Sequence, residues 1–247
     1  MLRTFTEAAA EYCAGAEKRV GQSAGRLLVL GALAGAFIAF AGVAATIAGT
    51  VGGKLATAAV FPAGLAMVIL AGSELFTGNC LLVMPVLGRK CRASGAARCW
   101  AVVYTANLAG AVLVAWLVTR CGVLDGVAEA AITTAAGKAA LPWGDIFLRG
   151  ILCNFLVCLA VWMAFCAKSA GGKVVSLYGP IFLFVLCGFE HCIANMYYIP
   201  AGIFLSGGSQ VSWAGFFHNL LPATLGNMVG GCGLGVILYG LYCKKSQ

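Results

Sequence analysis

Six long stretches of the sequence are almost free of charged residues, and they constrain the fold more than any other feature. The stretches are Leu27–Gly53, Leu55–Gly88, Cys99–Thr119, Ile146–Ala167, Val174–Leu205 and Phe216–Cys243. Each has the roughly 20 apolar residues that a helix needs to cross a bilayer core of about 30 Å. Only 10% of the 247 residues are charged and the mean hydropathy is +0.96, whereas a soluble domain is about one-quarter charged. The sequence predicts an all-α integral membrane protein, which excludes a soluble enzyme, a disordered chain and a nucleic-acid-binding domain.

Two of these stretches are too long for one straight helix. Leu55–Gly88 would extend about 51 Å as a single helix, and Val174–Leu205 about 48 Å, at the rise of an α-helix. Each also has glycine and a charged residue near its middle, at Gly72–Gly78 and at Gly188–His191. Non-helical backbone within a membrane is tolerated only where protein or water covers it. We therefore expect the second and fifth helices to be broken near the membrane centre.

The two predicted breaks lie three spans apart, and a second pattern has the same spacing. The third stretch contains Asn-Leu-Ala-Gly-Ala at Asn107–Ala111, and the sixth contains Asn-Met-Val-Gly-Gly at Asn227–Gly231. A repeat of three spans must run in opposite directions across the membrane. The pattern therefore predicts an inverted three-plus-three repeat, in which a substrate path lies near the midplane between discontinuous helices.

Basic residues are distributed unevenly between the two sides that six spans define. Twelve of the 16 Lys and Arg residues fall on the side of both termini. The other four are Lys54, Arg120, Lys138 and Arg149. The positive-inside rule then predicts a multi-pass protein of the inner (plasma) membrane with both termini in the cytoplasm. The net charge of +8 reflects this topology and contact with the anionic lipid bilayer, and no nucleic-acid partner is expected.

Three regions follow one another along the chain. Residues 1–26 have apolar residues at helical spacing among charged ones, which predicts an amphipathic cytoplasmic helix at the membrane surface. Residues 27–243 form the six-span transmembrane domain, and residues 244–247 a short cytoplasmic tail. The twelve cysteines have no metal-site spacing, so we expect free thiols that pack as small apolar residues, with no metal and no cofactor.

Titratable residues fall at both predicted breaks. Glu74 and Glu190 occupy matching places, and a carboxylate within a membrane is costly unless it is paired. We expect each to accept hydrogen bonds from the free N–H groups of its own break, and proton carriage is the less favoured alternative. His191 is favoured as a path-facing donor that can titrate, the alternative being a histidine held by backbone groups. The other histidine, His218, is expected at the outer interface.

Three further polar residues each have two interpretations. Thr77 lies in the first break, where its hydroxyl either bonds a passing solute or caps the following half-helix. Asn154, in an apolar run, either lines a path or ties helices together. Lys138 precedes the fourth stretch, and its simplest interpretation is a solvated loop lysine.

Four segments together resemble the signatures of the formate/nitrite transporter family. They are Ala71–Asn79, Asn154–Met163, Gly188–Met196 and Asn219–Asn227, in the expected order. The resemblance extends over nearly the whole chain. It implies an aquaporin-like six-helix protomer in a homopentamer, with a separate path in each protomer. It also implies that the protein is not an enzyme, and that its substrates are small monovalent anions of weak acids.

The resemblance also assigns residues by position. Phe61, Leu65 and Phe184 match the apolar constriction, Leu75, Phe76 and Thr77 the mobile loop of the second helix, and Val157 the apolar wall beside it. His191 and Thr77 match the central polar pair, Asn154 the pore asparagine, and Lys138 the basic residue near the outer vestibule. With Glu190 and Glu74 from the breaks, these residues make up the predicted substrate path and its constriction.

The expected function is passage of a small weak-acid anion, with formate first, hydrosulfide close behind and nitrite third. The segment Phe189–Pro200 resembles formate-type members of the family more than nitrite-type members. Two mechanisms remain open. In one, the anion crosses the apolar constriction in a buried positive field; in the other, His191 gives it a proton and the neutral acid crosses more cheaply. A neutral-solute channel of the aquaporin type is a remote alternative, because the chain has no paired Asn-Pro-Ala motifs.

Overall fold

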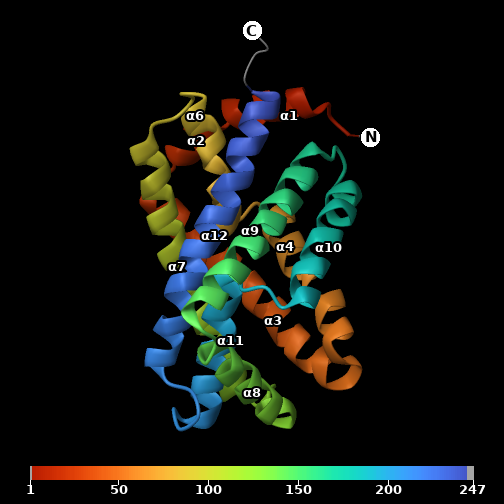
Figure 1. The fold of residues 1–247 in the computed structure, drawn as a ribbon, viewed down its shortest axis with the longest axis vertical. Helices are drawn as coiled ribbons and strands as arrows, with labels where there is room; N and C mark the ends of the chain where they lie inside the picture. Colours follow the sequence, from red (N-terminus) through yellow and green to blue (C-terminus); the bar gives the residue numbers. More distant parts are fainter. Residues whose placement is uncertain (1, 244–247) are drawn as a thin grey trace.

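The computed structural model describes residues 2–243, and the prediction of an all-α protein is confirmed (Figure 1). The helices are α1 (Phe5–Ala14), α2 (Ala16–Val20), α3 (Ala24–Val60), α4 (Pro62–Leu70), α5 (Phe76–Asn79), α6 (Val83–Leu87), α7 (Ala93–Arg120), α8 (Ala128–Ala139), α9 (Trp143–Cys166), α10 (Ala170–Cys187), α11 (Cys192–Ser206) and α12 (Trp213–Tyr242). Short 3-10 turns occupy Cys80–Leu82 and Asp125–Val127. An isolated β-bridge joins Leu2 to Ala167.

Most of the chain lies in helices suited to a bilayer. Within residues 2–243, five helical stretches are long and apolar enough to cross a membrane, judged by length and composition. They are Ala24–Leu70, Ala93–Arg120, Trp143–Cys166, Ala170–Cys187 and Trp213–Tyr242. Two shorter apolar stretches, Phe76–Leu87 and Cys192–Ser206, complete the set. All of them overlap the stretches that the sequence marks as nearly free of charge.

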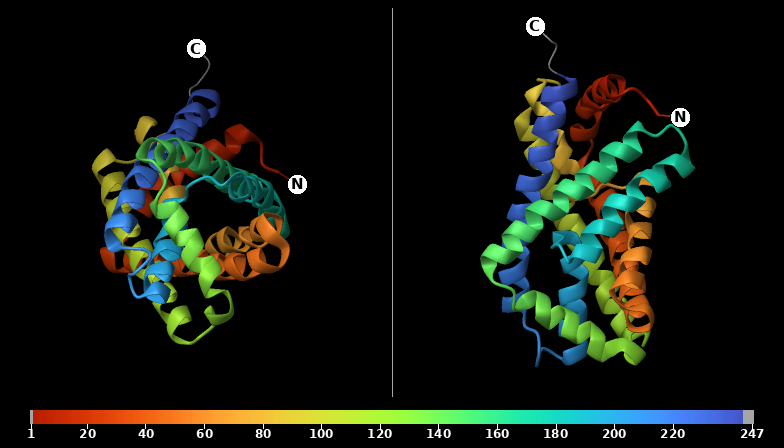
Figure 2. Two further views of the ribbon diagram at one scale, coloured as in Figure 1. Left: turned by 60° about the horizontal axis from the view of Figure 1, so that its bottom comes forward. Right: turned by 45° about the vertical axis from the view of Figure 1, so that its right-hand side comes forward.

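The first of these stretches, 47 residues long, is not one straight helix. Gly52 and Gly53 leave the helical region within α3, and Gly53 has a φ of 64°, which glycine adopts more readily than other residues. Beyond this point the hydroxyl of Thr57 donates to the carbonyl of Ala45 at 3.3 Å. The chain therefore reverses at these glycines, and its two arms lie side by side (Figure 2).

Helical backbone is also interrupted at two places further along the chain. Residues 71–75 separate α4 from α5, and residues 188–191 separate α10 from α11. Gly188, with a φ of 72°, ends α10 in the left-handed conformation, and Gly72, two residues after the end of α4, has a φ of 68°. The residues that start α5 and α11, Phe76 and Cys192, are both buried. Both half-helices therefore begin inside the bundle.

Two pairs of helices make the most extensive contacts in the bundle, α3 with α7 and α9 with α12. Gly110 of α7 lies directly on the backbone of Ala32, and Gly230 of α12 lies on the backbone of Ile151. A Cβ at either glycine would overlap the carbonyl oxygen of its neighbour. Small residues thus let the helices approach at backbone distance, as is usual where the surroundings are lipid.

The N-terminal region forms two helices instead of the single helix expected over residues 1–26. The break falls at Gly15, and glycine is among the least favourable residues in a helix interior. Thr4 caps α1, since its hydroxyl accepts the N–H of Glu7 at 3.3 Å and the Glu7 carboxylate accepts the N–H of Thr4 at 3.1 Å. Helix α1 lies at the same end of the molecule as the end of α12 (Figure 1). The predicted tail, 244–247, lies outside the described residues.

Candidate functional site

Three cavities follow one another through the bundle. The Lys138 cavity, of about 480 Å³, is lined by residues that include Thr46, Lys54, Phe61, Thr134, Lys138, Phe184, His191, Asn195 and Tyr198. The Arg19 cavity, of about 240 Å³, is lined by residues that include Tyr12, Arg19, Leu65, Glu74, Leu75, Asn79 and Lys173. The central cavity, of about 10 Å³, is lined by Ile38, Phe61, Leu65, Leu75, Val157, Ile181, Phe184 and His191.

The central cavity shares walls with both of its larger neighbours. Phe61, Phe184 and His191 line it and the Lys138 cavity. Leu65 and Leu75 line it and the Arg19 cavity. A single water needs about 10–15 Å³ of such space. The three cavities therefore form one row, and a solute that crosses its centre must leave most of its water behind.

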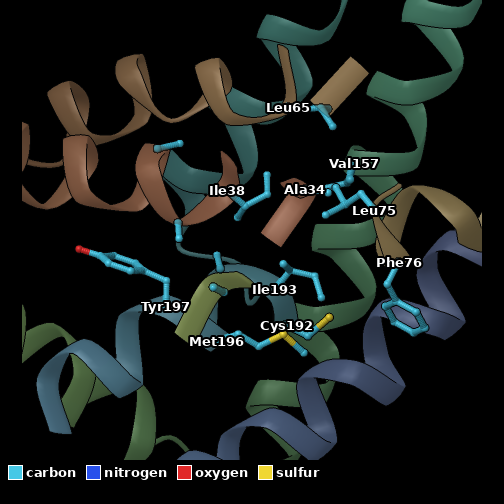
Figure 3. Packing of buried hydrophobic residues seen from close by; sticks show 14 of the residues in the cluster. Ala34, Ile38, Leu65, Leu75, Phe76, Val157, Cys192, Ile193, Met196 and Tyr197 are labelled. Carbon is cyan, nitrogen blue, oxygen red and sulfur yellow. The ribbon is translucent and has the colours of Figure 1, made fainter. Parts of the chain in front are cut away.

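Five of the six apolar residues that the resemblance assigns to the constriction, the mobile loop and the adjoining wall line the central cavity. They are Phe61, Leu65, Leu75, Val157 and Phe184, and none is more than 4% exposed. The rings of Phe61 and Phe184 meet edge to face with centroids 5.7 Å apart. Figure 3 shows the side chains of Leu65, Leu75 and Val157 gathered together. The apolar set thus comes from the junction of α3 and α4, from α4, α9 and α10, and from the interruption before α5.

The sixth residue, Phe76, lies away from the central cavity. Its ring packs edge-on against Tyr104 of α7, with centroids 4.9 Å apart. Figure 3 shows it pointing away from the group that Leu75 joins. Successive residues at the start of a helix point in different directions, so Leu75 and Phe76 cannot both face the path.

His191 places a polar group at the central cavity. Its Nδ1 accepts the backbone N–H of Ala194 at 3.1 Å, so the imidazole caps the N-terminus of α11. Because Nδ1 is an acceptor, the neutral ring carries its proton on Nε2. Nε2 lies 3.0 Å from the hydroxyl oxygen of Thr77, to which it donates. The structure thus brings together the pair that was predicted from sequence, with both residues buried.

Asn154 holds backbone groups and does not line any of the three cavities. Its Nδ2 donates to the carbonyls of Thr77 at 3.2 Å and Asn227 at 2.7 Å. The side chain is fully buried. These contacts agree with the second of the two interpretations, in which Asn154 ties helices together.

Asn107 of α7 holds the start of α5. Its Oδ1 accepts the N–H of Phe76 at 2.9 Å, and its Nδ2 donates to the carbonyls of Gly31 at 2.7 Å and Glu74 at 3.0 Å. The N–H group at the break is therefore bound by an asparagine, and the expectation that the Glu74 carboxylate binds it is wrong. A carboxylate would leave the two carbonyls without a donor.

Asn227 of α12 holds the start of α11 in the same way. Its Oδ1 accepts the N–H of Cys192 at 2.9 Å, and its Nδ2 donates to the carbonyls of Gly150 at 2.8 Å and Glu190 at 2.9 Å. The carboxylate of Glu190 likewise does not bind this N–H group, contrary to expectation. Both half-helices are thus fixed to a neighbouring span by one asparagine with three hydrogen bonds.

The carboxylate of Glu190 is instead bound by side chains. It accepts from Lys138 Nζ at 2.8 Å, Asn195 at 2.7 Å and Asn219 at 3.1 Å, and it is 2% exposed. A buried charge is tolerated only with such a partner and with its remaining lone pairs used. Lys138 is therefore the counterion of a buried carboxylate and not a solvated loop lysine.

The carboxylate of Glu74 has a similar but looser set of partners. It accepts from Asn79 at 2.9 Å and Gln22 at 3.4 Å, and it lies 3.9 Å from Arg19 Nε. Arg19 also donates to the hydroxyl of Tyr12 at 3.1 Å. Burial raises the pKa of Tyr12 to about 12, so this hydroxyl is neutral at physiological pH. Each end of the row thus has a basic residue beside a carboxylate.

The remaining candidates lie apart from this row. His218 is exposed, and its Nε2 lies 3.0 Å from the carbonyl of Leu141. All twelve cysteines are free, and seven of them are buried. Among residues 2–243, no group of three or more His, Cys, Asp or Glu side chains is arranged to hold a metal ion.

Known proteins are similar to this chain in sequence and in fold. A family model described as formate/nitrite transporter matches residues 6–241. A probable formate transporter of Methanothermobacter thermautotrophicus is 43% identical over 243 residues, which cover 87% of this chain and 88% of that protein. A solved FNT family ion channel superposes with a TM-score of 0.89 at 29% identity, over 96% of this chain and 99% of the other. A solved pentameric formate channel with formate bound gives 0.76 at 33% identity, over 90% and 98%.

Proposed function

The chain belongs to the formate/nitrite transporter family of membrane anion channels and transporters, and we propose that it passes formate along the row of three cavities. The observation that carries this proposal is the central cavity. It is apolar except for the imidazole of His191, and it joins two larger cavities that each contain basic side chains. A small anion is drawn to both ends and meets one hydrogen-bond donor at the centre.

We also propose that the chain has six spans in an inverted three-plus-three repeat, with the second and fifth spans broken. The reversal at Gly52–Gly53 supports this, because it divides the stretch Ala24–Leu70 into two spans. The interruptions at 71–75 and 188–191 fall in the second and fifth of the resulting spans. The matched hydrogen bonds of Asn107 and Asn227, in the third and sixth spans, add further support.

The proposed assembly is a homopentamer in the plasma membrane with both termini in the cytoplasm. Likeness to a solved pentameric formate channel at 33% identity supports five copies. The excess of Lys and Arg on the side of the termini supports the orientation. On this orientation the Arg19 cavity opens to the cytoplasm and the Lys138 cavity to the outside.

At the central cavity we propose that His191 acts as a hydrogen-bond donor. A carboxylate stripped of water needs a donor, and His191, whose ring lines that cavity, supplies Nε2–H when its bond to Thr77 is exchanged for one to the anion. Giving this proton away would leave an imidazolate, since Nδ1 already accepts the N–H of Ala194. A relay through His191 would first require protonation of Nδ1 and loss of that cap. The geometry therefore favours passage of the anion over protonation of formate by the histidine.

Formate is the preferred substrate because it is the smallest carboxylate and the central cavity is small. The names of a relative and of a structural neighbour, a formate transporter and a formate channel, support the same choice. Nitrite, which the family's name includes, and hydrosulfide have the same charge and comparable size. These two anions are the alternatives that an experiment has to separate from formate.

The test is uptake of formate, nitrite and hydrosulfide by liposomes that contain the purified protein. Formate should enter faster than through empty liposomes, and the Leu65→Trp variant, which fills the central cavity, should abolish this uptake. Leu183→Trp is the matched control, because Leu183 lies beside Phe184 in α10 but is 49% exposed and lines none of the three cavities. Uptake of nitrite or hydrosulfide without formate would replace the proposed substrate, and uptake unaffected by Leu65→Trp would exclude this path.

A further inference from the structure

We propose that Lys54 and Lys173 are the charges that collect anions at the two ends of the path, one in each large cavity. This inference rests on the proposed passage of a small anion. It assigns the attraction to two lysines without carboxylate partners, and not to the two basic residues that sit beside Glu190 and Glu74. The argument starts from the charge that each cavity presents to an approaching ion.

In the larger cavity, the charge of Lys138 is cancelled by a neighbour. Its Nζ lies 2.8 Å from Oε1 of Glu190, and the two unit charges nearly cancel for an ion several ångströms away. Lys54 lines the same cavity, and its Nζ lies 3.6 Å from the place that a Cβ on Gly188 would take. Among residues 2–243, Lys54 takes part in no ion pair. The net positive charge of this cavity is therefore supplied by Lys54.

The smaller cavity repeats the arrangement with different residues. Arg19 lies 3.9 Å from the carboxylate of Glu74, and both line this cavity. Lys173 also lines it, and within the described part of the chain Lys173 makes no ion pair. Two basic residues and one carboxylate leave a net charge of +1, as at the other end of the path.

The places of the two lysines in their helices are unfavourable for helix stability. Lys54 directly follows the non-helical Gly53, and Lys173 lies near the start of α10, which begins at Ala170. The N-terminus of a helix has a partial positive charge, so an acidic residue would stabilise these positions and a lysine does not. For an approaching anion, however, the helix N-terminus and the lysine act together. The arrangement thus serves attraction of anions and not stability of the helix.

The expected effect is on the rate of entry and depends on salt. Charged clefts raise the association rates of small ions by factors of about 10 to 10³. Loss of one unit charge from a cavity should lower the rate of anion entry by a factor at the lower end of this range, about tenfold in 0.01 M salt. The effect should fall below about twofold in 1 M salt, because the Debye length shrinks from about 30 Å to about 3 Å.

The experiment measures formate currents through the full-length protein in planar bilayers, with the anion added to one side at a time. Lys54→Gln should lower the current of formate entering at the larger cavity, and Lys173→Gln the current entering at the smaller one. Lys54→Arg and Lys173→Arg should keep the wild-type currents. Arg120→Gln and Lys168→Gln are matched controls, because both residues are exposed, basic and outside the cavities.

The outcomes separate this inference from the proposed function. If the wild type carries no formate current, formate is the wrong substrate, and the same comparison with nitrite still tests the lysines. If the wild type conducts but both Gln variants keep its currents and salt dependence, Lys54 and Lys173 do not collect anions. An equal loss in the Arg120→Gln and Lys168→Gln controls would also overturn the inference, because the effect would then belong to overall protein charge. Recovery of each variant at the wild-type assembly size checks its folding.

Discussion

Replacement of Asn227 by Leu tests how the start of α11 is held inside the helix bundle. The substitution keeps the size of the side chain and removes its hydrogen bonds to Cys192, Gly150 and Glu190, of 2.8 to 2.9 Å. Hydrogen bonds between helices of membrane proteins contribute about 0.6 to 1.7 kcal/mol each. Loss of all three should therefore lower the free energy of unfolding by about 2 to 5 kcal/mol. Transport by the folded fraction should also fall, because Cys192 is the residue next to His191.

The assay is thermal unfolding of the purified protein in detergent, with transport measured on the same preparations. Asn107→Leu removes an equivalent set of three bonds and should destabilise the protein to a similar extent. Thr224→Val removes one bond between helices, the 2.9 Å contact with Tyr104, and should cost about one-third as much. If Asn227→Leu is no less stable than Thr224→Val, the asparagine does not hold the half-helix as described.

Three further predictions concern the path and the assembly. Leu65→Ala or Phe184→Ala opens the wall of a cavity of about 10 Å³, so liposome uptake should rise severalfold and chloride should begin to pass; unchanged chloride flux in both variants would mean that the constriction lies elsewhere. His191→Phe removes a donor to a charged group, worth about 1.5 to 3 kcal/mol, so formate uptake followed with an internal dye between about pH 5 and 8 should fall at least tenfold. His191→Asn keeps a hydrogen-bond donor and should retain part of the formate uptake. If both variants show the wild-type dependence of uptake on pH, His191 is a purely structural residue. Mass measurement of the solubilised protein should give five copies of the 25.3 kDa chain, and a transport-competent monomer or dimer would contradict this.

Local features of the sequence were sufficient for much of the fold. The apolar stretches and their excess length follow from the composition of each segment alone, and the interruptions at 71–75 and 188–191 contain the glycines that the length argument pointed to. The polar pair of His191 and Thr77 was also predicted, through the resemblance of the segments around it. The apolar stretches and the interruptions depend on residues close together in the sequence, whereas His191 and Thr77 are 114 positions apart and were paired only through the family resemblance.

Contacts between distant segments were harder to predict. Lys138 and Glu190 are 52 positions apart, and only the packing of α8 against α11 brings them together. The hydrogen bonds of Asn79 to Glu74 and of Asn195 to Glu190, in contrast, could have been predicted, because the sequence contains a spacing that indicates them. Each asparagine follows its glutamate by five positions, about one turn into the half-helix, and the spacing is the same at both breaks.

The direction of a single side chain at a break could not be predicted. Phe76 was grouped with Leu75 because the two are adjacent in a loop that the family resemblance marks as mobile. In the structure Asn107 binds the N–H of Phe76 and fixes it as the first residue of α5. That bond decides which of the two side chains faces the central cavity, and it comes from a helix that is 31 residues away in the sequence.

The two interruptions are held by matching asparagines, Asn107 and Asn227, but they place different residues at the central cavity. This difference explains how one path can both attract and release an anion. Leu75 follows Glu74 and His191 follows Glu190, and both Leu75 and His191 line the central cavity. A leucine at both places would leave a dehydrated anion without any donor, which is costly in an apolar surrounding. A histidine at both places would hold the anion from two sides and slow its release, whereas conduction requires binding that is weak enough to leave. One donor facing one apolar residue meets both requirements, so the chemistry of the central cavity comes from the difference between Leu75 and His191 and not from the matching supports.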